Sequence, residues 1–416
     1  MNRRVILSFT TFVLLLLASI AAIAYTKGYR PNLKKTGPKV SATGLLVATS
    51  NPNGAQVFVD DHLTTATNDT LSLPEGNYAV KIVKDGYIPW GKKLKIKNGV
   101  VTETQARLFP SASDLRAETS TGAILPTLSP DGTKIVYGVA SGSAEKRGVW
   151  VMDMNDRPLL SQAQSRQIAQ SLAQADFAWS PDSKQILAST EKAIFLLEAD
   201  RLNPMPLDVT PTLNLLLQSW ENDAKSREND RLGNLKPNLL KELEKMKIIS
   251  WAPDETKILY TASQSATLPP ILEKPMPAAS TQDEQREIKE GSTYIYDIKE
   301  DKNFLITEKS LISQEDELKK DKQKAEEINP LVSVKRMGQL QRAQTLRWLP
   351  DSRHLVWVEE NGISILEYDG TNKDTIYSGP FEDSFVYPWP NGSKLIILTT
   401  YNRPGGATPN LYSISL

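Results

Sequence analysis

The segment Leu128-Ser129-Pro130-Asp131-Gly132-Thr133-Lys134-Ile135 is one of five copies of a short motif in this chain of 416 residues. Its order of Ser, Pro, Asp and Gly is the order that a type I turn favours, with Pro in the second position and Gly in the fourth. The apolar residues after Lys134 predict a short buried strand that directly follows the turn. The other four copies are Trp179–Lys184, Trp251–Ile258, Trp348–Arg353 and Trp389–Leu395.

Two apolar segments follow every copy of the turn, and both are short enough to be strands of one sheet. The first set is Lys134–Val139, Gln185–Ser189, Lys257–Thr261, His354–Val358 and Lys394–Leu398. The second set is Val149–Asp153, Ala193–Glu198, Thr293–Asp297, Ile363–Glu367 and Asn410–Ser413. Repeats near 40 residues with several strands each are typical of a β-propeller. A Trp before the turn offers a large apolar body, so we expect these side chains, Trp251 included, to pack between neighbouring repeats.

Residues 115–416 resemble the TolB-like propeller repeat, whose blades carry a W-S-P-D-G-x-x-I/L core followed by an I-Y-x-x-D strand. The resemblance implies an all-β domain with one blade per motif. It departs from the family in blade number, because five copies are recognisable where six blades are common. A degenerate sixth blade is therefore an alternative to a five-bladed ring.

Three insertions interrupt the repeat, at residues 211–247, 264–291 and 309–339. In the first, Leu239, Leu240, Leu243 and Met246 share one face of a predicted helix, which we expect to cap the rim of the propeller; docking of a partner is the alternative. The second is rich in proline and predicts a surface loop. Within the third, residues 313–327 pair acidic and basic residues at helical spacing and predict a solvated helix.

Residues 44–110 predict a small antiparallel β-sandwich. The segments Gly44–Ser50, Gln56–Asp60, Tyr78–Lys84 and Lys92–Lys97 alternate as strands do and are separated by turn residues. The stretches 50–60, 73–80 and 84–87 resemble a PEGA domain, with Leu73-Pro74-Glu75-Gly76-Asn77 at its central motif and Asn77 in place of the usual Ala. The resemblance implies a domain of cell-surface proteins that mediates binding. Pro74 and Gly76 also suit a turn without any further role.

The N-terminal residues predict a membrane anchor. Val5–Tyr25 is an apolar run without a charge, and as a helix it is long enough to cross the hydrocarbon core of a membrane. Residues 1–26 are therefore predicted to form a transmembrane signal anchor, and residues 27–43 a basic linker. A signal peptide cleaved after Ala24 is the alternative, because Ala22-Ile23-Ala24 fits the small-residue pattern. The short N-terminal tail favours export of the body, whereas the basic residues after the helix favour a cytoplasmic body.

Charge is distributed unevenly along the chain. Lys plus Arg and Asp plus Glu are both 49, but residues 1–40 hold seven basic residues and no acidic one, which leaves the body net negative. A negative body argues against nucleic acid as a partner. The chain has no cysteine and only two histidines, His62 and His354, which excludes thiol catalysis and thiolate zinc sites and disfavours a His-rich metal site.

No motif in the sequence predicts catalysis, a cofactor or a metal. Ser143-Ala144-Glu145-Lys146 matches S-x-x-K without the partner motifs of that chemistry. The motif carboxylates Asp131, Asp182, Asp254 and Asp351 are expected to serve their own turns. We therefore predict a non-enzymatic, membrane-anchored, extracytoplasmic binding or scaffold protein of the cell envelope, with a protein or cell-wall glycan as partner and its binding residues unknown. The alternatives are a propeller enzyme that acts on glycans through carboxylates in its central funnel, and a cytoplasm-facing sensor or scaffold.

Overall fold

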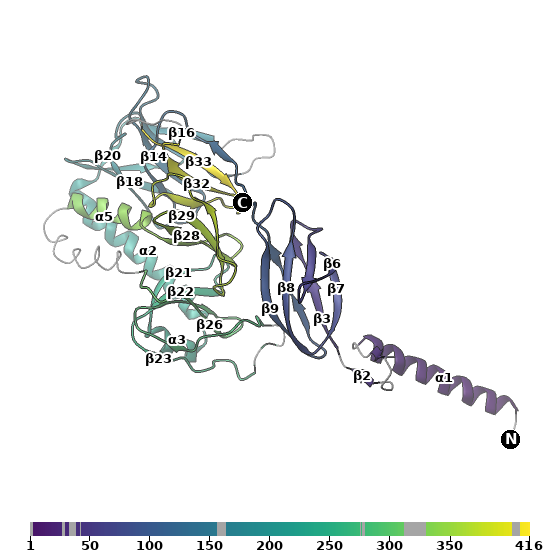
Figure 1. Ribbon diagram of the computed structural model, residues 1–416. Coiled ribbons are helices and arrows are strands. Elements are labelled where there is room, and N and C mark those ends of the chain that lie inside the picture. Colours follow the sequence, from purple (N-terminus) through teal and green to yellow (C-terminus); the bar gives the residue numbers. More distant parts are fainter. Residues whose placement is uncertain are drawn as a thin grey trace. The chain divides into compact units, whose positions relative to one another are not determined.

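The computed structural model describes residues 3–26, 30–32, 39–41, 43–155, 164–274, 276, 279–311, 330–401 and 408–416. These residues form two compact units, Met1–Ser111 with Lys274–Asp283, and Ala112–Glu273 with Glu284–Leu416 (Figure 1). The helix predicted at 313–327 lies outside the described residues, as does most of the basic linker.

Helix α1 (Arg3–Thr26) covers the apolar run at the N-terminus, so the predicted helical conformation is confirmed. Where its side chains are described they are mostly exposed, among them Phe9, Leu14 and Leu17. Within the described residues, no helix combines the length and the hydropathy that a membrane span needs. The short strands β1 (Arg30–Asn32) and β2 (Lys39–Ser41) follow and pair with each other.

The small β-domain consists of two sheets that enclose one apolar core. One sheet has the order β6-β5-β8-β9, and the other contains β10-β3-β7 with the short pair β11-β4 beside it. Val57, Ile82 and Ile96 from the first sheet and Leu46 from the second are fully buried in that core. The bounds are β3 Thr43–Ala48, β4 Ser50–Asn51, β5 Gln56–Val59, β6 His62–Ala66, β7 Asp69–Pro74, β8 Gly76–Val83, β9 Trp90–Ile96, β10 Val101–Glu103 and β11 Ala106–Arg107.

The purely antiparallel sandwich that the sequence predicts is wrong in one respect. Strand β10 pairs in parallel with β3, and β11 pairs in parallel with β4. Strands β10 and β11 follow the long β8–β9 hairpin. After this hairpin the chain returns to the second sheet and runs in the same direction as β3 and β4. Alternation of apolar and polar residues identifies a strand, but it does not show whether the neighbouring strand is parallel or antiparallel. The same side chains face the core in both arrangements.

In its described residues, the second unit contains five four-stranded antiparallel sheets, which we call blades 1 to 5 (Figure 1). In each of blades 1 to 4 the strands follow one another along the chain, and the motif turn joins the first strand to the second. Blade 5 differs, because β12, the first strand of the unit, pairs with β33, the last strand of the chain. The two ends of the unit are thereby joined in one sheet.

The strand bounds of the blades are as follows. Blade 1 is β13 (Ile124–Leu128), β14 (Lys134–Val139), β15 (Gly148–Asp153) and β16 (Gln164–Ala169), and blade 2 is β17 (Asp176–Trp179), β18 (Gln185–Ser189), β19 (Ile194–Glu198) and β20 (Leu207–Asp208). Blade 3 is β21 (Met246–Trp251), β22 (Lys257–Ala262), β25 (Thr293–Asp297) and β26 (Lys302–Thr307), and blade 4 is β27 (Leu346–Trp348), β28 (His354–Glu359), β29 (Gly362–Glu367) and β30 (Asp374–Tyr377). Blade 5 is β12 (Leu115–Ala117), β33 (Asn410–Ser415), β32 (Lys394–Thr399) and β31 (Val386–Pro388).

Apolar side chains join most neighbouring blades around the ring. One buried cluster contains Val136 of blade 1 and Trp179 of blade 2, and a second contains Trp389 of blade 5 with residues of blade 1. A third cluster combines Leu259 of blade 3 with Trp348 of blade 4. The prediction that the motif tryptophans pack between repeats is confirmed for these three.

Helices, rather than a sixth blade, stand between blades 2 and 3 (Figure 1). Helix α2 (Leu213–Gly233) follows the short η1 (Thr210–Thr212), and α5 (Pro330–Arg342) arrives from later in the chain. Trp220 of α2 and Val334 of α5 are buried against blade 2 in one apolar cluster. On the other side, Arg231 of α2 forms an ion pair of 2.8 Å with Glu255 in the motif turn of blade 3. The described residues therefore contain five blades, and α2 and α5 occupy the place that a sixth blade would take.

The rest of the first insertion and the second insertion differ from the sequence prediction. Helix α3 (Pro237–Leu243) is shorter than expected because Met246 already begins β21; Leu239 is buried against blade 3, as the capping prediction requires. The proline-rich insertion contains the strand pair β23 (Ala266–Thr267) and β24 (Glu287–Ile288) instead of only a surface loop. The carboxylate of Asp301 fixes it by accepting backbone N–H bonds from two consecutive residues, Ile271 and Leu272.

Candidate functional site

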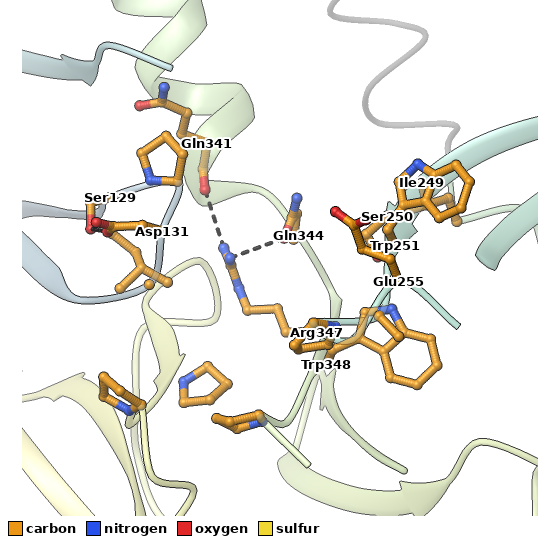
Figure 2. Close-up of a pocket in the computed structure, with 18 of the residues that line it drawn as sticks. Ser129, Asp131, Ile249, Ser250, Trp251, Glu255, Gln341, Gln344, Arg347 and Trp348 are labelled. Carbon is orange, nitrogen blue, oxygen red and sulfur yellow. Dashed lines mark hydrogen bonds between the residues drawn. The ribbon is translucent and has the colours of Figure 1, made fainter. Parts of the chain in front are cut away.

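The motif turns of four blades line a common pocket of about 880 Å³ (Figure 2). Pro130, Pro253, Pro350 and Pro390 contribute one proline from each of blades 1, 3, 4 and 5. Glu228 and Arg231 of α2 and Gln341 of α5 complete the lining on the side of the helices. The pocket therefore lies at the end of the ring where the turns meet.

Short hydrogen bonds hold each turn in shape. The hydroxyl of Ser129 donates to the Asp131 carboxylate at 2.6 Å and accepts the backbone N–H of Lys134 at 3.0 Å. Burial acts to raise the pKa of Asp131, but hydrogen bonds from Ser129 and Thr133 outweigh it, and the pKa lies below its usual range. The backbone N–H of Asp131 also donates to Ser183 in the turn of blade 2, at 3.1 Å. The carboxylate is thus engaged within its own turn, which is the role that the sequence predicts for it.

Arg347 lies at the centre of the pocket (Figure 2). It belongs to β27 and is only 8% exposed. Its guanidinium donates to the side-chain oxygen of Gln344 at 3.0 Å and to the backbone oxygens of Gln341 and Arg342 at 3.2 and 3.0 Å. These two carbonyls belong to the last turn of α5, where a cation is favourably placed.

The positive charge of Arg347 is not matched by a carboxylate. Among the described residues it forms no ion pair, and its Nε is buried without a hydrogen-bond partner. The guanidinium packs instead at 5.1 Å from the ring centre of Tyr387. Burial lowers the pKa of Arg347, as expected for a cation removed from water. A buried cation without a carboxylate partner is unfavourable, so an anionic or oxygen-rich group in the pocket would be attracted to it.

Two further polar groups of the lining are buried without a partner. The hydroxyl of Ser250 in β21 and the indole Nε1 of Trp348 in β27 have no hydrogen bond in the described part of the chain. The indole and the guanidinium are donors only, and the hydroxyl can donate. The hydroxyl oxygen and the indole nitrogen are both enclosed by protein, so a ligand in the pocket could bond them only if their neighbours moved.

Helix α5 is fixed to blade 2 by contacts that resemble strand pairing. The side-chain amide of Gln341 donates to the backbone oxygen of Trp179 at 3.0 Å and accepts its backbone N–H at 2.9 Å. Gly338 lies so close to β17 that a Cβ atom would be 2.2 Å from the carbonyl oxygen of Phe177. Arg342 adds an ion pair with Asp176 at 3.4 Å. The C-terminal end of α5, whose carbonyl oxygens bind Arg347, is thus held in a fixed position at the pocket.

The side of the pocket formed by α2 is acidic and its charges are paired. Arg231 contacts Glu228 at 3.8 Å and Glu255 at 2.8 Å, and Glu228 also accepts a hydrogen bond from the indole of Trp251 at 3.3 Å. Trp251 is only partly buried, so the prediction that it fills a space between two blades is wrong. The reason is that α2 stands where a preceding blade would supply a flat apolar face.

The other residues singled out by sequence lie apart from this pocket. His62 is exposed and bonds the backbone oxygen of Asp60 at 2.7 Å, whereas His354 is buried beside Asp351 at 2.8 Å. Ser143 and Lys146 lie in one exposed turn. Across the described residues no group of three His, Asp or Glu side chains is placed to hold a metal ion.

Sequence reasoning did not identify the pocket residues Ser250 and Arg347. A signal was available, because both directly precede a motif tryptophan, as does Pro388 in blade 5. Side chains alternate along a strand, so in blade 4, where Trp348 is buried in the cluster with blade 3, the residue before it points to the other side. A polar residue at that position therefore marks the lining.

The small β-domain is similar to a known family. Residues 43–112 match the PEGA domain family. The chain is similar to a solved structure described as TolB from Agrobacterium tumefaciens, with 14% identity, coverage of 72% of this chain and 75% of that chain, and a TM-score of 0.20. No curated protein matches the sequence. Because so distant a likeness carries no weight for function, the propeller assignment rests on the five blades themselves, and the chain combines a segment that matches the PEGA domain with a unit of propeller topology.

Proposed function

We propose that the protein is a non-enzymatic binding protein of the cell envelope, which holds a protein or glycan partner at the pocket where the motif turns meet. The observation that supports this proposal is the pocket of about 880 Å³ lined by four motif turns and two helices, in which Arg347 has no carboxylate partner among the described residues. Carbonyl, carboxylate and hydroxyl oxygens of a peptide or a glycan would be attracted to this cation. The half-buried indole of Trp251 adds an apolar surface of the kind that recurs at binding sites.

The rim carboxylates support binding rather than hydrolysis. Glu228 and Glu255 share the guanidinium of Arg231, and Asp131 is bonded within its turn. A glycosidase pair needs one carboxyl group that stays protonated near neutral pH and a second that is free to act. A chain that releases reducing sugar from cell-wall glycan would contradict this part of the proposal.

We further propose that α1 attaches the protein to a membrane with its body outside the cytoplasm. Support comes from the uncharged run Val5–Tyr25 and from the exposure of its described apolar side chains. A helix that presents such side chains to water on all sides is unfavourable unless lipid or protein covers it. Protease treatment of cells from which any outer membrane has been removed tests the orientation, since complete protection of the body would then place it in the cytoplasm.

Site-specific photo-crosslinking in intact cells tests the pocket. A photoreactive residue at Glu255, on the rim, is expected to capture a partner, whereas the same residue at Leu207, on the outer strand of blade 2, is the matched control. A second substitution, Arg347→Lys, should reduce capture from position 255, because Lys has one ammonium group in place of a planar donor fork. Equal capture from both positions would refute the assignment of the pocket.

A further inference from the structure

The outward face of strands β8 and β9 carries three exposed lysines, Lys81, Lys93 and Lys95, which we call the lysine face. The strand register places Lys81 opposite Gly91, Lys93 opposite Ala79 and Lys95 opposite Asn77. No acidic residue is therefore directly across from any of them. Within the described residues none of the three forms an ion pair.

This arrangement does not stabilise the sheet. Lys81 and Lys93 are diagonal neighbours on paired strands, and Lys93 and Lys95 are two residues apart on the same face. Like charges at these separations repel, whereas an Asp or Glu opposite each lysine would attract. The three lysines are thus gathered on one face of the domain, and none of them has a carboxylate partner in the part of the chain that the structure describes, which points to an anionic partner.

An apolar margin borders the lysine face. Phe58 of β5 is paired with Lys81 and is half-buried, and Leu63 of β6 is paired with Phe58 and is 58% exposed. Lysines next to an aromatic and an aliphatic side chain are the composition of surfaces that bind the membrane interface, where the apolar groups enter between headgroups. A purely electrostatic partner, such as an acidic polysaccharide, would leave Phe58 and Leu63 without a contact.

The position of this domain in the chain supports a lipid partner. Residues 27–42 separate α1 from β3, and even fully extended they reach at most about 55 Å. A domain tethered so closely to a membrane meets it at a high effective concentration, so weak contacts are enough for binding. This step rests on the membrane attachment of α1 proposed above.

We infer that the lysine face binds a membrane surface that contains anionic lipids. Each lysine near such a surface contributes about a fivefold gain in affinity, so the three together contribute roughly a hundredfold. The apolar margin would add a contribution that salt does not screen. The domain would then lie against the membrane rather than stand away from it.

The absence of cysteine from the chain allows a direct test with the full-length protein. Ala79→Cys places a single thiol among the lysines, and Thr70→Cys on β7 of the other sheet is the matched control. Each variant is labelled with a fluorophore and reconstituted in vesicles that carry a spin-labelled lipid as quencher. We expect quenching at position 79 in vesicles with about 30% phosphatidylglycerol and little quenching in vesicles of phosphatidylcholine alone. In the anionic vesicles, 0.5 M salt should reduce the quenching at least tenfold. The triple substitution Lys81→Glu, Lys93→Glu and Lys95→Glu should reduce it to the same extent.

The controls separate this inference from the attachment of α1. Flotation with phosphatidylcholine vesicles measures the attachment of α1 alone. If the full-length protein does not float with these vesicles, the proposed anchor is wrong. Binding of the lysine face is then measured by co-sedimentation with anionic vesicles. Equal quenching at position 79 in neutral and anionic vesicles, or no effect of the triple variant, would overturn the inference. Release from anionic vesicles by soluble polygalacturonate, without any lipid dependence of quenching, would assign the face to an acidic polysaccharide instead. The salt titration uses the unsubstituted lysines, so the test does not depend on folding of the triple variant.

Discussion

Replacement of Gly338 by alanine tests whether α5 truly fills a place in the ring. In a helix that is free on this side, Gly→Ala stabilises by up to about 1 kcal/mol, because alanine loses less backbone entropy. At position 338 the added Cβ would lie 2.2 Å from the carbonyl oxygen of Phe177, far inside contact distance. That oxygen belongs to the backbone of β17 and cannot turn aside, so the helix must move away from blade 2. Overpacking of this kind costs about 1–3 kcal/mol.

The two effects have opposite signs, which makes a matched control decisive. At Gly233, the end of α2, the Cβ that alanine adds would meet no atom within 4 Å, so Gly233→Ala is expected to raise the free energy of unfolding by up to about 1 kcal/mol. Gly338→Ala is expected to lower it by about 0–2 kcal/mol, which separates the variants by about 1–3 kcal/mol. Urea midpoints followed by tryptophan fluorescence measure the difference, and Trp179 lies beside α5 to report it. Equal stabilisation by both substitutions would show that α5 does not pack on blade 2.

The remaining predictions concern the motif and the pocket. Trp179→Ala should lower the free energy of unfolding by about 3–5 kcal/mol, and Trp251→Ala by clearly less, because Trp179 is fully buried and Trp251 is not; equal urea midpoints would contradict this. Arg347→Lys should cost about 1–3 kcal/mol, since the bonds to two carbonyls of α5 are lost, and an unchanged midpoint would exclude that role. Because the pKa of Asp131 is lowered in the folded state, its ionised carboxylate stabilises the fold at pH values above the pKa of the unfolded state, near 4. This contribution is lost as the pH falls through the pKa of the folded state. Ser129→Ala removes one of the responsible hydrogen bonds, so urea midpoints between pH 3 and 6 should depend less on pH than in the unsubstituted chain.

The blades could be predicted because their signals are local. A turn of Ser, Pro and Asp followed by an apolar run determines a strand within a few residues, and β14, β18 and β25 have the predicted bounds. The inter-blade position of Trp179 could also be inferred, since a large apolar side chain at a repeated position must be covered by the next repeat.

The helical part of the ring could not be predicted in the same way. Helix α2 carries charged residues around most of its surface, and only Leu213 and Trp220, seven positions apart, are buried. Such a pattern predicts a solvated helix, not one that replaces a blade. Helix α5 depends on contacts between residues more than 150 positions apart, such as the bonds between Gln341 and Trp179. A repeat motif counts blades but contains no information about what fills the space between two of them.

The helices also explain why the pocket has chemistry that a regular ring would lack. Each of the four motif turns at the pocket contributes a proline, and the carboxylate of Asp131 is already bonded within its own turn, so repetition alone would line the pocket with nearly inert groups. The exceptions are Arg347, which reaches toward the end of α5, and Arg231, which belongs to α2. Both charges are at the pocket because helices occupy the place of a blade. Substitutions in 211–247 and 330–347 should therefore alter ligand choice, whereas substitutions in the turns should alter mainly stability.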